Sequence, residues 1–222
     1  MNSTMTARPA STRRLVVMDV DSTLITQEVV ELLADHAGTR DLVADVTERA
    51  MRGEIDFAES LRERVATLAG VPVSAFEDVL EKVTLTPGAT ELVAELQRRG
   101  WTVALVSGGF EEIVAPLAAR LGITHFRANR LEVEDGRLTG RTTGPVIDRA
   151  TKEATLRDLA AAEGVDMTDT VAIGDGANDL DMIGAAGIGI AFAAKPVVVA
   201  QAPYSVPGPR LDAVLEIIDA QA

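Results

Sequence analysis

Residues 16–25 read VVMDVDSTLI. The apolar run favours a buried strand, yet it leads into two aspartates, Asp19 and Asp21, with one residue between them. Because side chains alternate along a strand, we expect the two carboxylates to point to the same side. Burying an ionised carboxylate costs several kcal/mol unless a partner compensates its charge. The pair therefore either lies in a solvated loop by accident or is held at the strand end for chemistry.

The rest of the chain predicts that this strand belongs to a parallel sheet. Four short apolar runs alternate with helical patterns, which implies right-handed βαβ crossovers. The helical patterns at 90–100 and 151–164 both end at a glycine, and 131–140 is typical of a β-hairpin. We predict an α/β fold, a Rossmann-like core whose mostly parallel sheet is flanked by helices. The predicted strands are 15–18, 102–106, 170–173 and 188–192.

Between Asp21 and the second predicted strand lie about eighty residues without a convincing strand. Asp56 and Ser74 are each followed three residues later by a glutamate, a pattern typical of helix starts. We therefore expect a small helical cap inserted after the first strand. The cap helices are predicted at 28–37, 56–70 and 74–83. The predicted division is a disordered lead-in at 1–13, a core of 14–25 and 87–222, and the cap at 26–86.

Composition excludes several classes of partner. The 222 residues suit one α/β domain with an insertion, and the formal charge of -13 opposes nucleic acid and anionic membranes as partners. The chain has no cysteine, and no apolar run reaches the length of a membrane span. Asp19 interrupts the apolar run that follows Arg13 and Arg14, so a signal-peptide core is absent. We expect a cytoplasmic protein. The sequence is silent on its oligomeric state.

Polar residues collect at the carboxyl ends of three predicted strands, where parallel sheets bind ligands. Asp19 and Asp21 follow the first strand, SGGF (107–110) the second, and GDGAND (174–179) the third. Each motif alone is also compatible with an ordinary turn. Together, however, three or four converging carboxylates favour Mg²⁺, a hard ion that takes oxygen ligands and often a substrate phosphate.

Two further residues near these ends have both a structural and a functional interpretation. Ser107 offers a hydroxyl, and the backbone N–H groups of the two glycines after it, Gly108 and Gly109, can approach an anion. Lys152 opens a predicted helix, where acids are usually favoured. It is either a surface lysine or a cation placed for an anionic substrate.

The predicted cap carries two charged residues that could select a leaving group. Arg64 lies seven residues after Phe57, within the apolar face of its helix. Either its stem packs while its head reaches water, or its guanidinium faces the site, ready for a carboxylate. Glu28 is either a surface acid or a partner for an ammonium group. Together the two would fit the zwitterionic head of an amino acid.

The order D-x-D-S-T, Ser, Lys and G-D-G-x-N-D resembles the haloacid dehalogenase superfamily over nearly the whole chain. The resemblance implies that Asp19 is a nucleophile that forms an aspartyl-phosphate and that Asp21 is the general acid and base. Ser107 and Lys152 would bind phosphoryl oxygens. The implied Mg²⁺ ligands are Asp19, Asp21 and Asp175, with Asp179 and Asn178 in support.

Longer stretches narrow the resemblance to the members of that superfamily that hydrolyse O-phospho-L-serine, the last step of serine biosynthesis. The stretches that carry this narrower resemblance are MDVDSTLI, AMRGEIDFAESLRERV, SGGF and AIGDGANDLDMI. By this resemblance Glu28 binds the substrate amine and Arg64 its carboxylate. Met51, Phe57 and Gly108 would line the pocket. Val20 departs conservatively from the usual Phe or Met, and we expect no N-terminal regulatory domain.

Two other functions stay open at this point. A relative with the same catalytic residues could pass the phosphoryl group to a small alcohol such as homoserine. A phospho-accepting signalling domain also uses an aspartate, a hydroxyl, a lysine and Mg²⁺, but it needs neither Asp21 nor a helical cover. In the preferred interpretation the partner is a small phosphorylated amino acid.

Overall fold

The computed structural model describes residues 14–221, and the lead-in predicted at 1–13 lies outside the described residues. Seven strands are found within them: β1 (Leu15–Met18), β2 (Thr102–Phe110), β3 (His125–Glu134), β4 (Arg137–Thr143), β5 (Thr170–Gly174), β6 (Ile188–Phe192) and β7 (Tyr204–Val206). They form one sheet in the order β4-β3-β2-β1-β5-β6-β7. Every neighbouring pair is parallel except β3 and β4. The predicted α/β class is confirmed.

The described residues also form ten α-helices. In 14–221 no helix combines the length and the apolar character needed to cross a membrane. The helices are α1 (Val29–Ala37), α2 (Arg40–Met51), α3 (Phe57–Ala66), α4 (Ala75–Lys82), α5 (Ala89–Arg98), α6 (Glu111–Arg120), α7 (Arg149–Glu163), α8 (Leu180–Ala185), α9 (Pro196–Val199) and α10 (Val214–Ala220).

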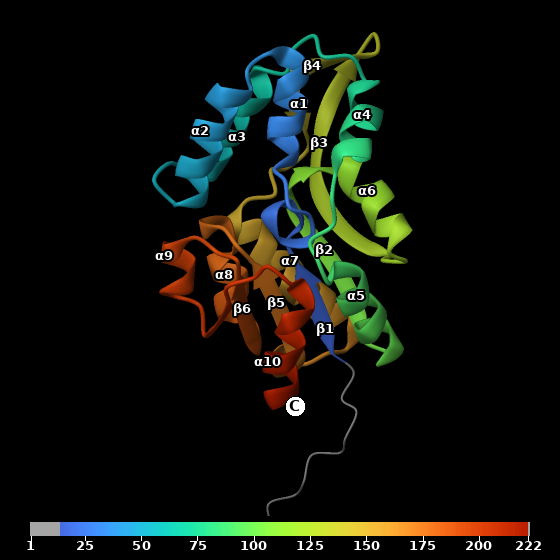
Figure 1. Ribbon diagram of the computed structural model, residues 1–222, viewed down its shortest axis with the longest axis vertical. Coiled ribbons are helices and arrows are strands. Elements are labelled where there is room, and N and C mark those ends of the chain that lie inside the picture. The colour runs from blue at the N-terminus through green and yellow to red at the C-terminus, as the bar shows by residue number, and fades with distance from the viewer. Residues whose placement is uncertain (1–13, 222) are drawn as a thin grey trace, which may run out of the picture.

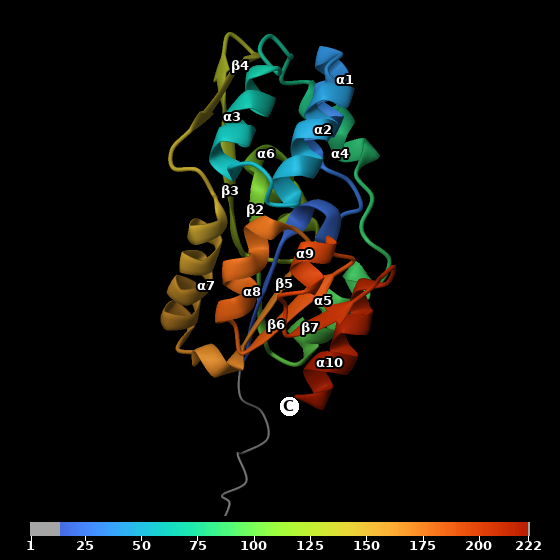
Figure 2. The same ribbon diagram turned by 90° about the vertical axis from the view of Figure 1, so that its left-hand side faces the viewer.

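Helices cover both faces of the sheet, which explains why the central strand β1 is apolar at every position. Figure 2 shows α7 and α8 on one side of the sheet and α5 and α10 on the other. Val16 and Met18 of β1 pack in the core cluster that contains α5 and α10, whereas Leu15 and Val17 pack in the cluster that contains α7 and α8. A strand buried on both faces needs apolar residues at consecutive positions.

Helices α1 to α4 lie together beyond the carboxyl ends of the strands (Figure 1). The β3–β4 hairpin reaches up to them, since Leu138 N donates to Val71 O and Gly70 N donates to Leu138 O, both at 2.8 Å. The hairpin turns at Asp135 and Gly136, as predicted, with φ of 50° and 73°. The helical group therefore rests on the end of the sheet and on its edge hairpin. Its division from the core at residues 26 and 86 stays a prediction.

Several element boundaries differ from the sequence expectation. The run at 102–106 continues as strand to Phe110, and the helix predicted at 56–70 ends at Ala66. The helix α2 and the strand β7 were not predicted. Three residues of strand are too few to give a pattern, and α2 is largely polar.

The capping pair predicted at Ser74 is wrong, whereas Asp56 does cap its helix. Asp56 accepts a hydrogen bond from the backbone N of Glu59 at 2.8 Å. Ser74 makes no side-chain cap bond and has helical φ and ψ of −60° and −21°. An N-cap side chain needs an extended backbone to reach the third amide, and the chain has already turned at this serine.

Candidate active site

The register of the central strands brings three polar strand ends to one edge. Met18, the last residue of β1, pairs with Leu105 of β2 and with Ile173 of β5. Asp19 follows directly, and its backbone N donates to Ile173 O at 2.9 Å. Asp175 lies two residues beyond Ile173 on the neighbouring chain segment. The convergence predicted from the parallel sheet is therefore present.

Asp21 is positioned by a turn rather than by the strand. β1 ends at Met18, and Val20–Leu24 forms a wide turn. The expectation that strand geometry points Asp19 and Asp21 to the same side is therefore wrong, because Asp21 lies outside the strand. Both carboxyl groups nevertheless line one cavity, because the turn folds Asp21 back towards it.

The same turn fixes the start of α1. Ser22 has a φ of 56°, a left-handed conformation that costs a non-glycine residue about 1 kcal/mol. Its hydroxyl donates to Glu28 Oε1 at 2.6 Å, and the backbone N of Val29 donates to Asp21 Oδ1 at 3.2 Å. The strained turn thus holds Asp21 and Glu28 at the same time.

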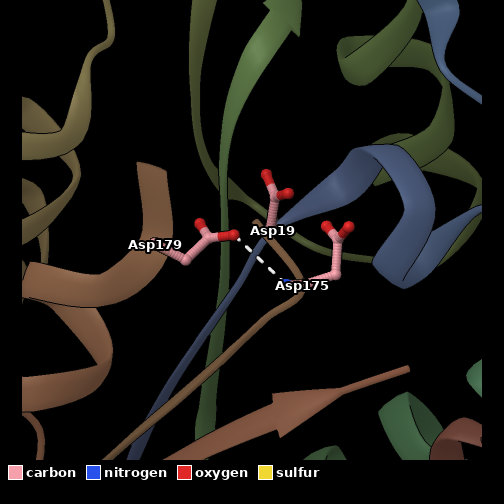
Figure 3. Close-up of side chains that lie close together, drawn as sticks. All are labelled: Asp19, Asp175 and Asp179. Carbon is pink, nitrogen blue, oxygen red and sulfur yellow. Dashed lines mark hydrogen bonds between the residues drawn. The ribbon is translucent and has the colours of Figure 1, made fainter. Parts of the chain in front are cut away.

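Three carboxylates meet at the sheet edge, as Figure 3 shows for Asp19, Asp175 and Asp179. One oxygen from each lies within 4.8 Å of the others, and all three residues are buried. The Oδ2 atom of Asp179 accepts hydrogen bonds from the backbone N of Asp175 at 3.2 Å and of Gly176 at 3.1 Å. Asp179 therefore braces the loop that presents Asp175.

Burial sets the electrostatics of this group. It raises the pKa of Asp19 from 3.8 to about 7, and the charge of Asp179 adds to the effect while Lys152 opposes it. Burial also raises the pKa of Asp175 and that of Asp21 well above the ordinary value, and the charge of Glu28 is the next cause in both. Buried carboxyl groups of this kind are stable only when a proton or a nearby cation compensates their charge.

Lys152 supplies one cation from the buried side. Its side chain is fully buried, and Nζ lies 2.7 Å from Asp19 Oδ1 and 2.7 Å from Asp179 Oδ1. Burial lowers the pKa of Lys152, but the charges of Asp179 and Asp19 outweigh it, so the pKa lies above its ordinary value. One lysine against several carboxylates leaves the site short of positive charge.

The remaining donor set fits a hard divalent cation. Oxygen ligands from several carboxylates are what such ions prefer. The Oδ1 atom of Asn178 is buried and has no hydrogen-bond partner among the described residues. Asp21 does not belong to the group of three carboxylates within 4.8 Å, so its part in holding a metal stays a prediction.

The cavity above the carboxylates is lined from both the sheet and the helical group. Its lining includes nine of the residues predicted for the site: Asp19, Asp21, Glu28, Met51, Phe57, Arg64, Gly108, Asp175 and Asn178. Arg64 is only 3% exposed, so the interpretation in which its head reaches water does not hold. Burial lowers its pKa, and the charges of Glu28 and Asp21 oppose that shift. An acid and a buried guanidinium thus face the same cavity as the aspartate pair.

Three predicted residues lie behind the lining rather than in it. Ser107, Lys152 and Asp179 are each fully buried. Ser107 Oγ accepts a hydrogen bond from the backbone N of Gly109 at 2.8 Å. A Cβ on Gly109 would stand 2.4 Å from Asp21 Oδ2, so only glycine leaves room for that carboxyl group.

Sequence reasoning missed three residues that shape the cavity. Val30 and Leu61 line it, as does Gly109 of the SGGF motif, and Asn129 Nδ2 donates to Gly108 O at 2.8 Å. Leu61 lies on the apolar stripe of α3 and so had a signal. Val30 and Asn129 had none, because their contacts depend on the packing of distant segments.

Comparison of the sequence with known proteins identifies the family of this chain. The model of the haloacid dehalogenase-like hydrolase family matches residues 16–183. The chain belongs to this family. It is 55% identical over 205 residues to a phosphoserine phosphatase of Streptococcus thermophilus, covering 92% of this chain and 95% of that protein. It is 56% identical to a phosphoserine phosphatase of Streptomyces coelicolor, covering 93% of this chain but 50% of the longer relative.

Solved structures of family members agree with the fold. A structure described as a phospho-aspartyl intermediate analogue of phosphoserine phosphatase superposes with a TM-score of 0.91 at 40% identity, covering 93% of this chain and 99% of that one. A substrate-bound phosphoserine phosphatase complex gives a TM-score of 0.91 at 39% identity with the same coverage. The predicted family resemblance is confirmed.

Proposed function

We propose that this hydrolase removes the phosphoryl group from O-phospho-L-serine and releases L-serine and phosphate. The observation that carries the proposal is the cavity in which Glu28 and the buried Arg64 face the Asp19–Asp21 pair. The names of the relatives support the same reaction. The proposal extends to the last step of serine biosynthesis, in the cytoplasm.

The two charged residues match the two charges of the amino-acid head. A guanidinium donates two parallel hydrogen bonds to a carboxylate, and a buried pair of this kind is strong and directional. Glu28 offers a carboxylate to the substrate ammonium group, and its Oε1 is held by Ser22. Met51, Phe57 and Leu61 give the same cavity an apolar lining. A substrate that lacks the carboxylate leaves the buried Arg64 without this partner.

Asp19 and Asp21 divide the chemistry between them. An oxygen of Asp19 attacks phosphorus, the bond between phosphorus and the serine oxygen breaks, and Asp21 gives its proton to that oxygen. Burial raises the pKa of Asp21 well above its ordinary value, which favours its role as a proton donor. A water molecule then attacks phosphorus, Asp21 takes its proton, and the bond to Asp19 breaks to release phosphate. Lys152 holds Asp19 in place throughout and offsets part of the charge.

The proposed cofactor is Mg²⁺, held by Asp19, Asp175 and the segment at Asp21, with Asp179 and Asn178 in support. The buried carboxylates and the unpartnered Asn178 Oδ1 fit such an ion. When bound, it neutralises negative charge between the carboxylates and the phosphoryl oxygens. Ser107 and Lys152 add a hydroxyl and an ammonium on the buried side, and Gly108 lets the backbone approach the phosphoryl group.

The test is phosphate release from matched substrates, each assayed with Mg²⁺ and with EDTA. The panel contains O-phospho-L-serine, its D-enantiomer, O-phosphothreonine, phosphoethanolamine, which lacks the carboxylate, and 3-phosphohydroxypropionate, which lacks the amine. We expect phosphoserine to have the highest kcat/KM and EDTA to abolish turnover. Equal use of phosphoethanolamine would contradict the substrate assignment. Formation of phosphohomoserine in place of phosphate when homoserine is added would instead indicate a phosphotransferase.

A further inference from the structure

The guanidinium of Arg64 is held by a set of acceptors that the proposed mechanism does not use. Its Nε donates to Ser60 O at 3.1 Å. One terminal nitrogen donates to Thr47 Oγ1 at 3.2 Å, and the other donates to Ser60 Oγ at 3.4 Å. The guanidinium carbon also lies 5.7 Å from the centre of the Phe57 ring. Three hydrogen bonds and one aromatic ring thus hold the guanidinium in place.

A count of N–H groups shows what remains for a ligand. A guanidinium has five N–H donors, one on Nε and two on each terminal nitrogen. Within residues 14–221 three of them are used, one on each nitrogen of Arg64. Two are left, one on each terminal nitrogen. A bidentate carboxylate contact likewise takes one N–H from each of two nitrogens.

The two hydroxyl groups are themselves fixed in direction. Thr47 Oγ1 donates its proton to Val43 O at 2.8 Å, and Ser60 Oγ donates to Phe57 O at 2.8 Å. A hydroxyl has one proton, so towards Arg64 each can act only as an acceptor. Both residues are buried, with exposures of 3% for Thr47 and 1% for Ser60. Neither lines the cavity, so neither can bind the substrate itself.

Thr47 differs from Ser60 in where it comes from. Ser60 and Arg64 lie one turn apart on α3, whereas Thr47 belongs to α2. The hydrogen bond from Arg64 to Thr47 therefore sets the guanidinium plane relative to a second helix. Without that acceptor the plane can turn about its long side chain, and one more N–H is buried without a partner.

We propose that Thr47 and Ser60 are positioning residues that orient Arg64, so that its two unused N–H groups point at the carboxylate of the substrate. This inference rests on the proposed function and concerns the same site. The hydroxyl groups do not touch the substrate. They determine how strongly the enzyme prefers a phosphorylated amino acid over a phosphate ester without a carboxylate.

The test replaces the Thr47 hydroxyl without changing its shape. Thr47→Val removes the acceptor, Thr47→Ser keeps it, and Ser60→Ala removes the second acceptor. We expect Thr47→Val to lower kcat/KM for phosphoserine about tenfold, mainly through KM, since a hydrogen bond to a charged group is at stake. Phosphoethanolamine should be affected far less. Thr47→Ser should restore most of the preference, and Ser60→Ala should reduce it in the same direction.

A matched control separates positioning from packing. Thr39 Oγ1 donates to Thr67 Oγ1 at 3.1 Å and so links α2 to the end of α3 without touching the guanidinium. Thr39→Val should therefore leave the ratio of the two substrates as it is. If Thr47→Val lowers both substrates alike, as a loosened helix pair would, the inference is wrong. Should Thr47→Val not fold, an unchanged substrate ratio in Ser60→Ala would overturn it.

Arg64→Ala distinguishes this inference from the function on which it rests. If Arg64→Ala does not change the substrate ratio, the proposed carboxylate contact itself fails. If Arg64→Ala does change the ratio and the hydroxyl variants do not, only the positioning role fails.

Discussion

Replacing Arg64 by alanine tests the contact that makes the substrate an amino acid. Arg64 is 3% exposed, so a substrate carboxylate bound to it would also be taken out of water. Removing one partner of such a pair costs about 2–5 kcal/mol. At about 1.4 kcal/mol per decade, Arg64→Ala should lower kcat/KM for phosphoserine between about thirtyfold and several-thousandfold.

The assay compares two substrates and two arginines. Phosphoethanolamine never makes the carboxylate contact, so its kcat/KM should fall far less in Arg64→Ala. Arg62 is exposed on the same helix, and Arg62→Ala should leave both substrates nearly unchanged. Arg64→Ala also removes the hydrogen bonds and the ring contact of the arginine, so the melting temperature of this variant should fall. An equal loss for both substrates would mean that Arg64 acts only by packing, and would refute the reasoning.

Three further predictions concern the acid, a close contact and the metal. Asp21→Asn should lower turnover by about 10²–10⁴-fold while Mg²⁺ still raises the melting temperature, because only the proton transfer is lost; unchanged turnover of phosphoserine would count against Asp21. Gly108→Ala should destabilise by about 1–3 kcal/mol and impair turnover, since the new Cβ would stand 2.5 Å from Cζ of Phe57. Gly184→Ala is its control, because a Cβ there meets nothing within 4 Å, and equal melting temperatures for the two would contradict the prediction. For the metal-free protein, the free energy of unfolding should fall as pH rises from about 4 to about 7, because the folded state keeps a proton on Asp19, whose pKa is raised to about 7, that the unfolded state has released. Mg²⁺ should therefore raise the melting temperature more at pH 8 than at pH 5, and an equal shift at both would contradict this assignment.

The sequence predicts the sheet edge well because its signals are local. β1 is a run of apolar residues that ends directly at Asp19, and the parallel arrangement then requires its neighbours to end at the same place. Spacing along α3 likewise predicts that Arg64 lies on the apolar face. In both cases a local sequence pattern predicts where the functional side chain lies on its strand or helix.

Features that depend on contacts between distant segments could not be predicted in the same way. The acceptor for Arg64 is Thr47, seventeen residues earlier on a different helix, and Lys152 meets Asp19 across 133 positions of the chain. The turn at Ser22 has a left-handed φ that a serine rarely adopts, so the sequence predicts an extended backbone at Asp19 and Asp21 instead of a turn. Tertiary packing fixes these features.

The central claim is that Asp19 carries the phosphoryl group during turnover. The most direct measurement is acid quenching of the enzyme within a single turnover of phosphoserine in Mg²⁺, followed by mass spectrometry of its peptides. The account predicts one phosphoryl group on the peptide that contains Asp19, labile to alkali as an acyl phosphate is. Asp19→Asn, which keeps the shape of the side chain, should show neither label nor turnover. A label on another residue, or full turnover by Asp19→Asn, would contradict the account.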